Sequence, residues 1–252
     1  MKGKGKLILG MACLFLVGGF PGAGFPWGDA PTHFSISYDA GLRANLAPDH
    51  LMTFVQASAC PDLANTFLFR STDRTYIHEE GFAEAMFYVA EHPHDRRWKR
   101  YWKPRWLATA QGWQAHLAAD EVAHSEYVPE EQVLHDLVEF EVDVCVYYEK
   151  PAPSVPGVDS WQKVNICEDC CDPWLLYWAS YIYTKGKKPV YPWMTKQALE
   201  TLKTAIQKEY ELIASRGGPE RAEGALRFLV PGKDWETYYN AAVDEVAALL
   251  PE

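Results

Sequence analysis

Apolar residues recur every three or four positions over most of the chain, which is the spacing of one buried face of an α-helix. Prolines divide this pattern into segments. Pro93 follows one segment, and Pro104 and Pro129 stand where the first turn of a new helix tolerates a residue without an N–H. The predicted helices cover 42–58 with a break at Pro48, 78–91, 104–128, 129–150, 174–184, 194–217 and 234–250.

Apart from these helices, the sequence predicts one long loop and contains one segment that could be a strand. Residues 151–172 contain three prolines and are predicted to form a loop that cysteines tie down. Residues 142–148, VDVCVYY, are ambiguous between strand and helix, whereas 174–184 is apolar nearly all round and is expected to be buried. The pattern predicts an all-α fold, with one helical domain over 25–252.

The first residues have the three parts of a secretory signal. Three lysines in MKGKGK precede an apolar run of 14 residues, which ends in the small residues Gly22, Ala23 and Gly24. We therefore expect residues 1–24 to be a signal peptide and the mature protein to be secreted or periplasmic. Two alternatives are an uncleaved anchor, for which the run is short against the roughly 20 residues of a spanning helix, and a lipid-modified Cys13.

Composition and charge restrict the class of protein. The 252 residues are 48% hydrophobic, enough for a full core, and 34 acidic residues against 24 basic ones give a net charge of -10. This balance argues against a nucleic-acid groove and favours metal cations. The five cysteines beyond residue 24 are expected to include a disulfide staple, with a zinc site at CEDCC (167–171) as the alternative and the pairing left open.

The segment GWQAHLAADEVAH carries three ligand-type side chains at four-residue spacing. His116, Asp120 and His124 climb one face of a helix and drift by roughly 40° per step, and alanines beside them allow other helices to approach. His135 and Glu139 repeat the spacing on the next predicted helix. Two successive helices could therefore bring five ligands to one volume.

Three more candidates, His33, Asp62 and His78, each lie near a predicted helix end. Nitrogen and carboxylate ligands without an obligatory thiolate suit zinc in hydrolytic sites that keep a water position open. Taken singly, each has a simpler interpretation: a lone histidine is commonly hydrogen-bonded, and a pair four apart is commonly a solvated helix contact. The triple motif is the rarer pattern and favours a metal site.

In this order, the motifs WGDAPTHFSI, ASACPDL, YIHEEGF, GWQAHLAADEVAH and HDLVEFEVD resemble the bacterial zinc-dependent phospholipase C family, and more distantly the fungal single-strand zinc nucleases. The resemblance covers roughly residues 27–143. It implies an all-helical domain with a trinuclear zinc site between its helices. The glycine-rich segment and the final motif of the nucleases are missing, so the phospholipase branch is the closer one.

The resemblance also implies which residues hold each of three zinc ions. Asp120 would bridge two of the ions, and Trp27 would bind through its backbone only as a new N-terminus, which cleavage after Gly24 would not produce. Leu63 stands where choline-cleaving members carry an aromatic residue, so a choline preference is not implied. The implied ligands are Asp62, His78, His116 and Asp120 for the first ion, His33, Asp120 and Trp27 for the second, and His124, His135 and Glu139 for the third.

The function expected from this resemblance is phospholipase C activity at a membrane surface, which releases diacylglycerol and a phosphorylated head group. Asp62 is the expected catalytic residue, because its family counterpart touches both metal and nucleophile. Trp98, Trp102, Trp106 and Trp113 could form a lip for the lipid, or could pack in the core. The alternatives are a secreted zinc nuclease or nucleotidase, and a non-catalytic binding protein stapled by zinc; the sequence indicates no protein partner.

Overall fold

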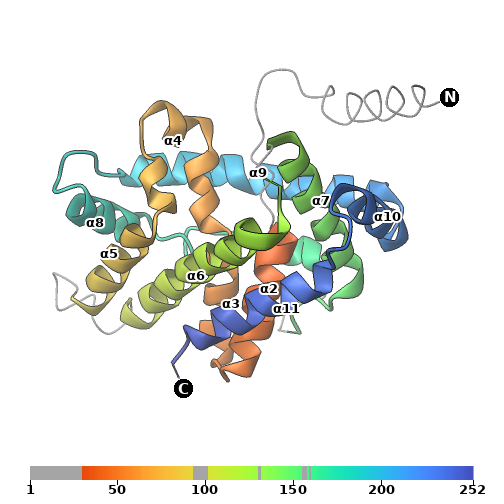
Figure 1. Cartoon of the computed structure of the whole chain (residues 1–252). Helices are drawn as coiled ribbons and strands as arrows, with labels where there is room; N and C mark the ends of the chain where they lie inside the picture. Colours follow the sequence, from red (N-terminus) through yellow and green to blue (C-terminus); the bar gives the residue numbers. More distant parts are fainter. Residues whose placement is uncertain (1–29, 93–101, 130–131, 155–157, 159, 252) are drawn as a thin grey trace.

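The computed structural model of the chain describes residues 30–92, 102–129, 132–154, 158 and 160–251 (Figure 1). The predicted signal peptide, Trp27 and Trp98 lie outside these residues. Within them the fold is all-α, as predicted, and no strand occurs. The helices are α2 (Ala30–Arg43), α3 (Pro48–Ala57), α4 (Phe67–Ser71), α5 (Glu80–Glu91), α6 (Lys103–Val122), α7 (Gln132–Glu149), α8 (Pro173–Tyr183), α9 (Pro192–Arg216), α10 (Pro219–Leu229) and α11 (Trp235–Ala248).

Short segments of other helical types connect these helices. Two 3-10 turns, η1 (Cys60–Asn65) and η2 (Thr75–His78), flank α4, and a third, η4 (Trp161–Lys163), lies in the loop before α8. A π-helical turn, η3 (Ala123–Tyr127), extends α6. The predicted stops also hold: Gly217 ends α9 with a φ of 88°, a conformation that glycine adopts without strain.

Helix α6 is the centre of the arrangement and packs against α2, α3, α5 and α11 (Figure 1). Gly112 permits its close contact with α3, because a Cβ there would lie 2.4 Å from the carbonyl oxygen of Phe54. Trp106 and Trp113, on the same helix, are buried in the core. Within the described residues, no helix is long and apolar enough to cross a membrane.

Several local predictions were wrong. The apolar pattern missed α2 and α10. Helix α8 is not buried all round, because Trp174 and Tyr181 are 47% and 46% exposed. Two other points are not errors. Residues 142–148, which were ambiguous by pattern, are helical as part of α7, in agreement with the helix predicted over 129–150. The five described cysteines are free thiols here, so the expected disulfide is not shown.

Candidate metal centre

Four separate elements bring five of the predicted ligands together. His33 comes from the start of α2, Asp62 from η1, His78 from the end of η2, and His116 and Asp120 from α6. Their ligand atoms form two overlapping groups, one of His33, His116 and Asp120 and one of Asp62, His78 and His116, each with its atoms within 4.8 Å of one another. The chain has therefore collected nitrogen and carboxylate donors around one small volume.

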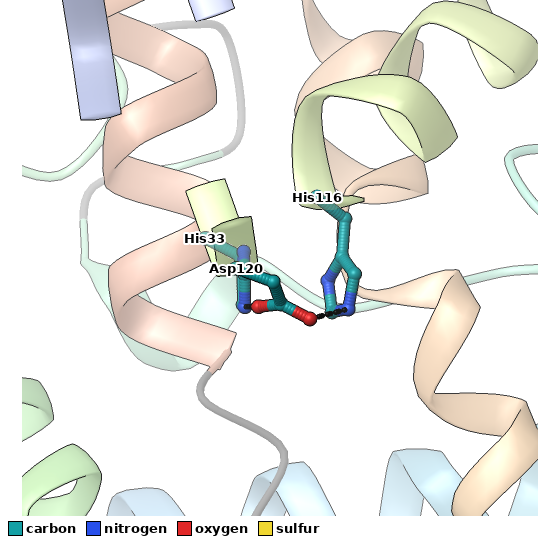
Figure 2. A group of neighbouring side chains, drawn as sticks. All are labelled: His33, His116 and Asp120. Carbon is teal, nitrogen blue, oxygen red and sulfur yellow. Dashed lines mark ion pairs between the residues drawn. The ribbon is translucent and has the colours of Figure 1, made fainter. Parts of the chain in front are cut away.

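The carboxylate of Asp120 faces ring nitrogens of both His33 and His116, whose rings stack with centroids 4.0 Å apart (Figure 2). One oxygen is 3.3 Å from Nε2 of His33, and the other is 3.2 Å from Nε2 of His116 and 3.3 Å from Nε2 of His78. Oδ1 of Asp62 lies 3.9 Å from Nε2 of His116 on the other side. Asp120 thus presents one oxygen to each of two neighbouring positions, which is the arrangement a bridging carboxylate needs.

The end of α3 orients the ring of His116 and contacts the backbone of His33. Nδ1 of His116 lies 2.8 Å from the carbonyl oxygen of Ser58, so Nε2 is the nitrogen that faces the carboxylates. The hydroxyl of Ser58 donates to the carbonyl oxygen of His33. A histidine whose second nitrogen is fixed by a backbone carbonyl is typical of metal ligands. The close contact at Gly112 is what allows this bond, because it brings α6 against α3.

Trp113 holds η2 in place. Its indole nitrogen donates to the carbonyl oxygen of Ile77 at 2.8 Å, one residue before His78. Of the two interpretations of Trp106 and Trp113, core packing is confirmed, since both rings are buried. Trp113 also positions a ligand-bearing turn.

A second group lies beside the first. Nε2 of His135 and Nε2 of His124 approach the same oxygen of Glu139, at 2.7 and 3.2 Å. His124 belongs to the π-helical turn that follows α6, and π turns interrupt helices most often at functional sites. The two later residues come from α7, four apart as predicted. The three side chains form a third possible metal group.

One pocket borders both groups. Its lining includes His33 and Asp120 of the first group and Glu139 of the second, with Thr32 and Tyr127 between them. The two ligand clusters therefore border one small space, with a volume of about 10 Å³.

The protonation of two of the three buried histidines suits a cation. His33 differs, because burial is outweighed by the hydrogen bond and charge of Asp120, which raise its pKa. Burial lowers the pKa values of His78 and His116, which favours the neutral rings that bind metals. Burial opposes ionisation of Asp120, but the nearby His116 and His33 outweigh it and hold its pKa well below the usual range. Burial raises the pKa of Asp62 to about 6, against the effect of His33 and His78. Its Oδ2 atom has no hydrogen-bond partner.

The structure brings together eight predicted ligands from the described residues, while Trp27 lies outside them. The sequence did not reveal two residues that support the ligands. These are Ser58, which fixes His116, and Asn65, whose amide donates to Oδ1 of Asp62 at 3.1 Å. A carbonyl or amide in a helix end carries no distinctive sequence signal, so spacing alone could not have found them. Comparisons with protein families, with curated proteins and with solved structures gave no match.

Proposed function

We propose that the protein is a zinc-dependent phosphodiester hydrolase and that its substrates are phospholipids, which it cleaves as a phospholipase C. The observation that carries this proposal is Asp120, which offers its two oxygens to different histidines while Glu139 borders the same pocket. Several cations held side by side suit a phosphodiester, whose negative charge increases on the leaving oxygen during hydrolysis.

In this proposal the residues divide into holding and proton-transfer roles. The ligand set fits zinc because all donors are imidazole nitrogens and carboxylate oxygens. Zinc, when bound, neutralises phosphoryl oxygens and makes water a better nucleophile. Asp62 is the proposed general base, because its buried Oδ2 is unpartnered and can accept a proton from that water. The proposed ligands are His33, Asp62, His78, His116 and Asp120 for two ions and His124, His135 and Glu139 for a third.

The number of ligands separates this proposal from a structural role for zinc. Structural zinc sites are closed by four protein ligands, whereas here eight residues would serve three ions, so that not every ion can have four ligands even if Asp120 bridges two of them. An open coordination position is the place at which water or substrate binds. The zinc-stapled binding protein is therefore the weaker alternative.

A surface on α8 and the start of α9 supports contact with lipid. Rings of Trp174, Tyr177, Trp178, Tyr181 and Tyr191 contact one another in series, and Trp193 beside them is 58% exposed. Exposed tryptophan and tyrosine favour the headgroup region of a bilayer. The turn between these helices adds the exposed Lys185, Lys187 and Lys188, which suit anionic headgroups.

The proposal is tested by metal analysis and two kinds of substrate. Purified protein should contain zinc, release diacylglycerol from mixed phospholipid vesicles, and lose both properties in chelator. Single-stranded DNA and RNA serve as the competing substrates for a nuclease. Protein with less than about one zinc per chain and an unchanged melting temperature in chelator would contradict the metal site. Zinc-dependent cleavage of nucleic acid without lipid cleavage would favour the nuclease.

A double substitution of exposed rings separates lipid contact from chemistry. Trp174→Ser with Trp193→Ser should reduce hydrolysis of vesicles by about tenfold or more, because about 1.4 kcal/mol of interfacial binding is lost. A short-chain soluble phosphodiester should be cleaved at the wild-type rate. Phe228→Ser on α10, which removes another exposed ring (65% exposed), is the matched control.

A further inference from the structure

Four cysteines meet between η1 and the turn that precedes α8. Cys60 is the first residue of η1, and Cys167, Cys170 and Cys171 lie in that turn. Three of the four are buried to 1% exposure or less, and Cys167 is half-buried. Cys145 is part of α7 and is not among them. The candidate metal centre does not include these cysteines.

The four thiols contact one another in a defined order. The backbone nitrogens of Cys167 and Cys170 donate to each other's sulfur atoms at 2.9 and 3.3 Å. The Cys60 thiol lies 3.9 Å from the carbonyl oxygen of Cys170, in the peptide that joins Cys170 to Cys171, and it interacts with the thiols of both residues. The sulfur atoms therefore follow one another as 167, 170, 60 and 171.

This order disfavours a single metal ion at the cluster. A tetrahedral thiolate site requires its sulfurs to surround one point. Among the described residues, no cysteine belongs to a group of three or more ligand atoms that lie within 4.8 Å of one another. The geometry is that of neighbouring pairs instead.

We propose that the four thiols form two disulfides, Cys167–Cys170 and Cys60–Cys171. Four groups in a row can be completely paired between neighbours in only this way, because a Cys60–Cys170 bond would leave the two end thiols apart. Direct pairing of Cys170 with Cys171 is disfavoured, since adjacent Cα atoms lie about 3.8 Å apart and disulfides usually need about 4.4–6.8 Å.

The oxidant is an exogenous disulfide. Each new bond forms by thiol exchange: two cysteine thiols lose two electrons and two protons, and one molecule of oxidised small-molecule disulfide is reduced to two thiols. The buried position of Cys60 and Cys171 means that exchange begins at half-buried Cys167 and during opening of the turn.

The two bonds have different consequences. Cys167–Cys170 closes a short turn, whereas Cys60–Cys171 links segments separated by about 110 residues and so restricts the unfolded chain far more. It also fixes η1 against the start of α8, where Asp172 accepts hydrogen bonds from the first backbone N–H groups. The inference concerns covalent structure alone and does not depend on the proposed hydrolase activity.

The test is disulfide mapping of the whole protein after oxidation with glutathione disulfide. Free thiols are blocked, the protein is digested, and fragmentation in the mass spectrometer assigns each sulfur within the CEDCC peptide. We expect the Cys60 peptide linked to Cys171, a loop between Cys167 and Cys170, and Cys145 blocked as a free thiol. Linkage of Cys60 to Cys170, or four blocked thiols, would overturn the proposal, as would tightly bound zinc that protects all four.

Thermal unfolding supplies a second measurement. Reduction of the oxidised protein should lower the melting temperature by about 5–15 °C, the range expected for loss of one long-loop disulfide in a chain of this size. Cys171→Ser should show nearly the lower value and only a small further response to reductant, because the short Cys167–Cys170 loop is the bond that remains, whereas Cys145→Ser, the matched control, should respond like wild type. If Cys171→Ser does not fold, mapping of the wild type still decides the pairing. An unchanged melting temperature on reduction would contradict the long-range bond.

Discussion

The group around Asp120 and the group around Glu139 contain the same donor types in different surroundings. His116 is 1% exposed and Asp120 16%, whereas His124 is 45% exposed. The first group combines four elements that are distant in sequence, and the second combines a π turn with the helix that follows it. A histidine and a carboxylate four residues apart can therefore belong to a buried group of side chains or to a more exposed one.

The two groups also differ in what orients their rings. His116 is fixed by the carbonyl oxygen of Ser58 at 2.8 Å, and His78 follows a turn that Trp113 anchors. In the second group, the Nδ1 atom of His135 approaches the carbonyl oxygen of Pro129 at the longer distance of 3.3 Å. A better-oriented and drier group should bind its ions more tightly. We therefore expect the buried group to determine activity and stability, and the exposed group to exchange its ion more readily.

The largest expected effect is that of Asp120→Asn. One neutral amide oxygen replaces two anionic ones between His33 and His116, so the buried group should lose its zinc and turnover should fall by about 10⁴-fold or more. Zinc stoichiometry and phospholipid hydrolysis are measured together. Glu121→Gln, an exposed carboxylate next to it on α6, is the control and should leave both unchanged.

Asp62→Asn should separate catalysis from metal binding within the buried group. Its other ligands remain, so most of the zinc should be retained while turnover falls by roughly 10²- to 10⁴-fold, as expected for a lost general base. The measurements are zinc content and a pH–rate profile. Near-wild-type turnover in both this variant and Asp120→Asn would show that the catalytic site has been misplaced.

His116→Ala and His124→Ala compare the two groups on one continuous helical segment. In zinc-free protein, His116→Ala should reduce the free energy of unfolding by about 2–4 kcal/mol, because it opens a cavity and leaves the Ser58 carbonyl unsatisfied. His124→Ala should cost less than about 0.5 kcal/mol, as is usual at the surface. Urea unfolding measures both. Equal losses would mean that the burial difference has no energetic consequence.

The order of zinc release sharpens the same comparison. During titration with chelator, wild-type protein should release the ion of the exposed group first, and activity should persist in part until the buried ions leave. In Trp113→Phe, which removes the donor to Ile77, the buried ions should be released about tenfold more easily. The exposed ion is the internal control. Simultaneous release of all zinc from wild type would contradict two independent groups.

The smallest expected effect is a dependence of stability on pH, which arises from the buried carboxyl group of Asp143. Burial raises the pKa of Asp143 from 3.8 to about 6, against the effects of the neighbouring Glu209 and of hydrogen bonds from Thr32. The folded state therefore retains a proton that the unfolded state has lost, so this carboxyl stabilises the fold most below about pH 4 and less as pH rises through 6. Asp143→Asn keeps the acceptor oxygen and should be more stable than wild type at pH 8 by up to about 3 kcal/mol. Thermal unfolding should show a gain of only about 1 kcal/mol at pH 4.5, because there the folded carboxyl is still protonated while the unfolded one is mostly ionised.

The sequence by itself predicted the helical class and the residues that the structure gathers into three possible metal groups. The spacing of apolar residues and the positions of the prolines predicted α5, α6, α7 and α9 with their approximate ends, because these signals act within one helix. His116 with Asp120, and His135 with Glu139, were found for the same reason: a spacing of four places two side chains on one face.

Only the tertiary structure shows what holds the candidate ligands in place. The resemblance already implied that His124 groups with His135 and Glu139, and the structure adds that a π turn carries His124, whose Nε2 lies 3.2 Å from Glu139. Trp113 could be a lipid-facing ring or a core residue by its pattern, and contact with Ile77 settled it as core. The order of the four thiols around Cys60 was equally hidden, because it depends on contacts between segments about 110 residues apart. Spacing reports the geometry within one helix, whereas these arrangements arise from packing between helices.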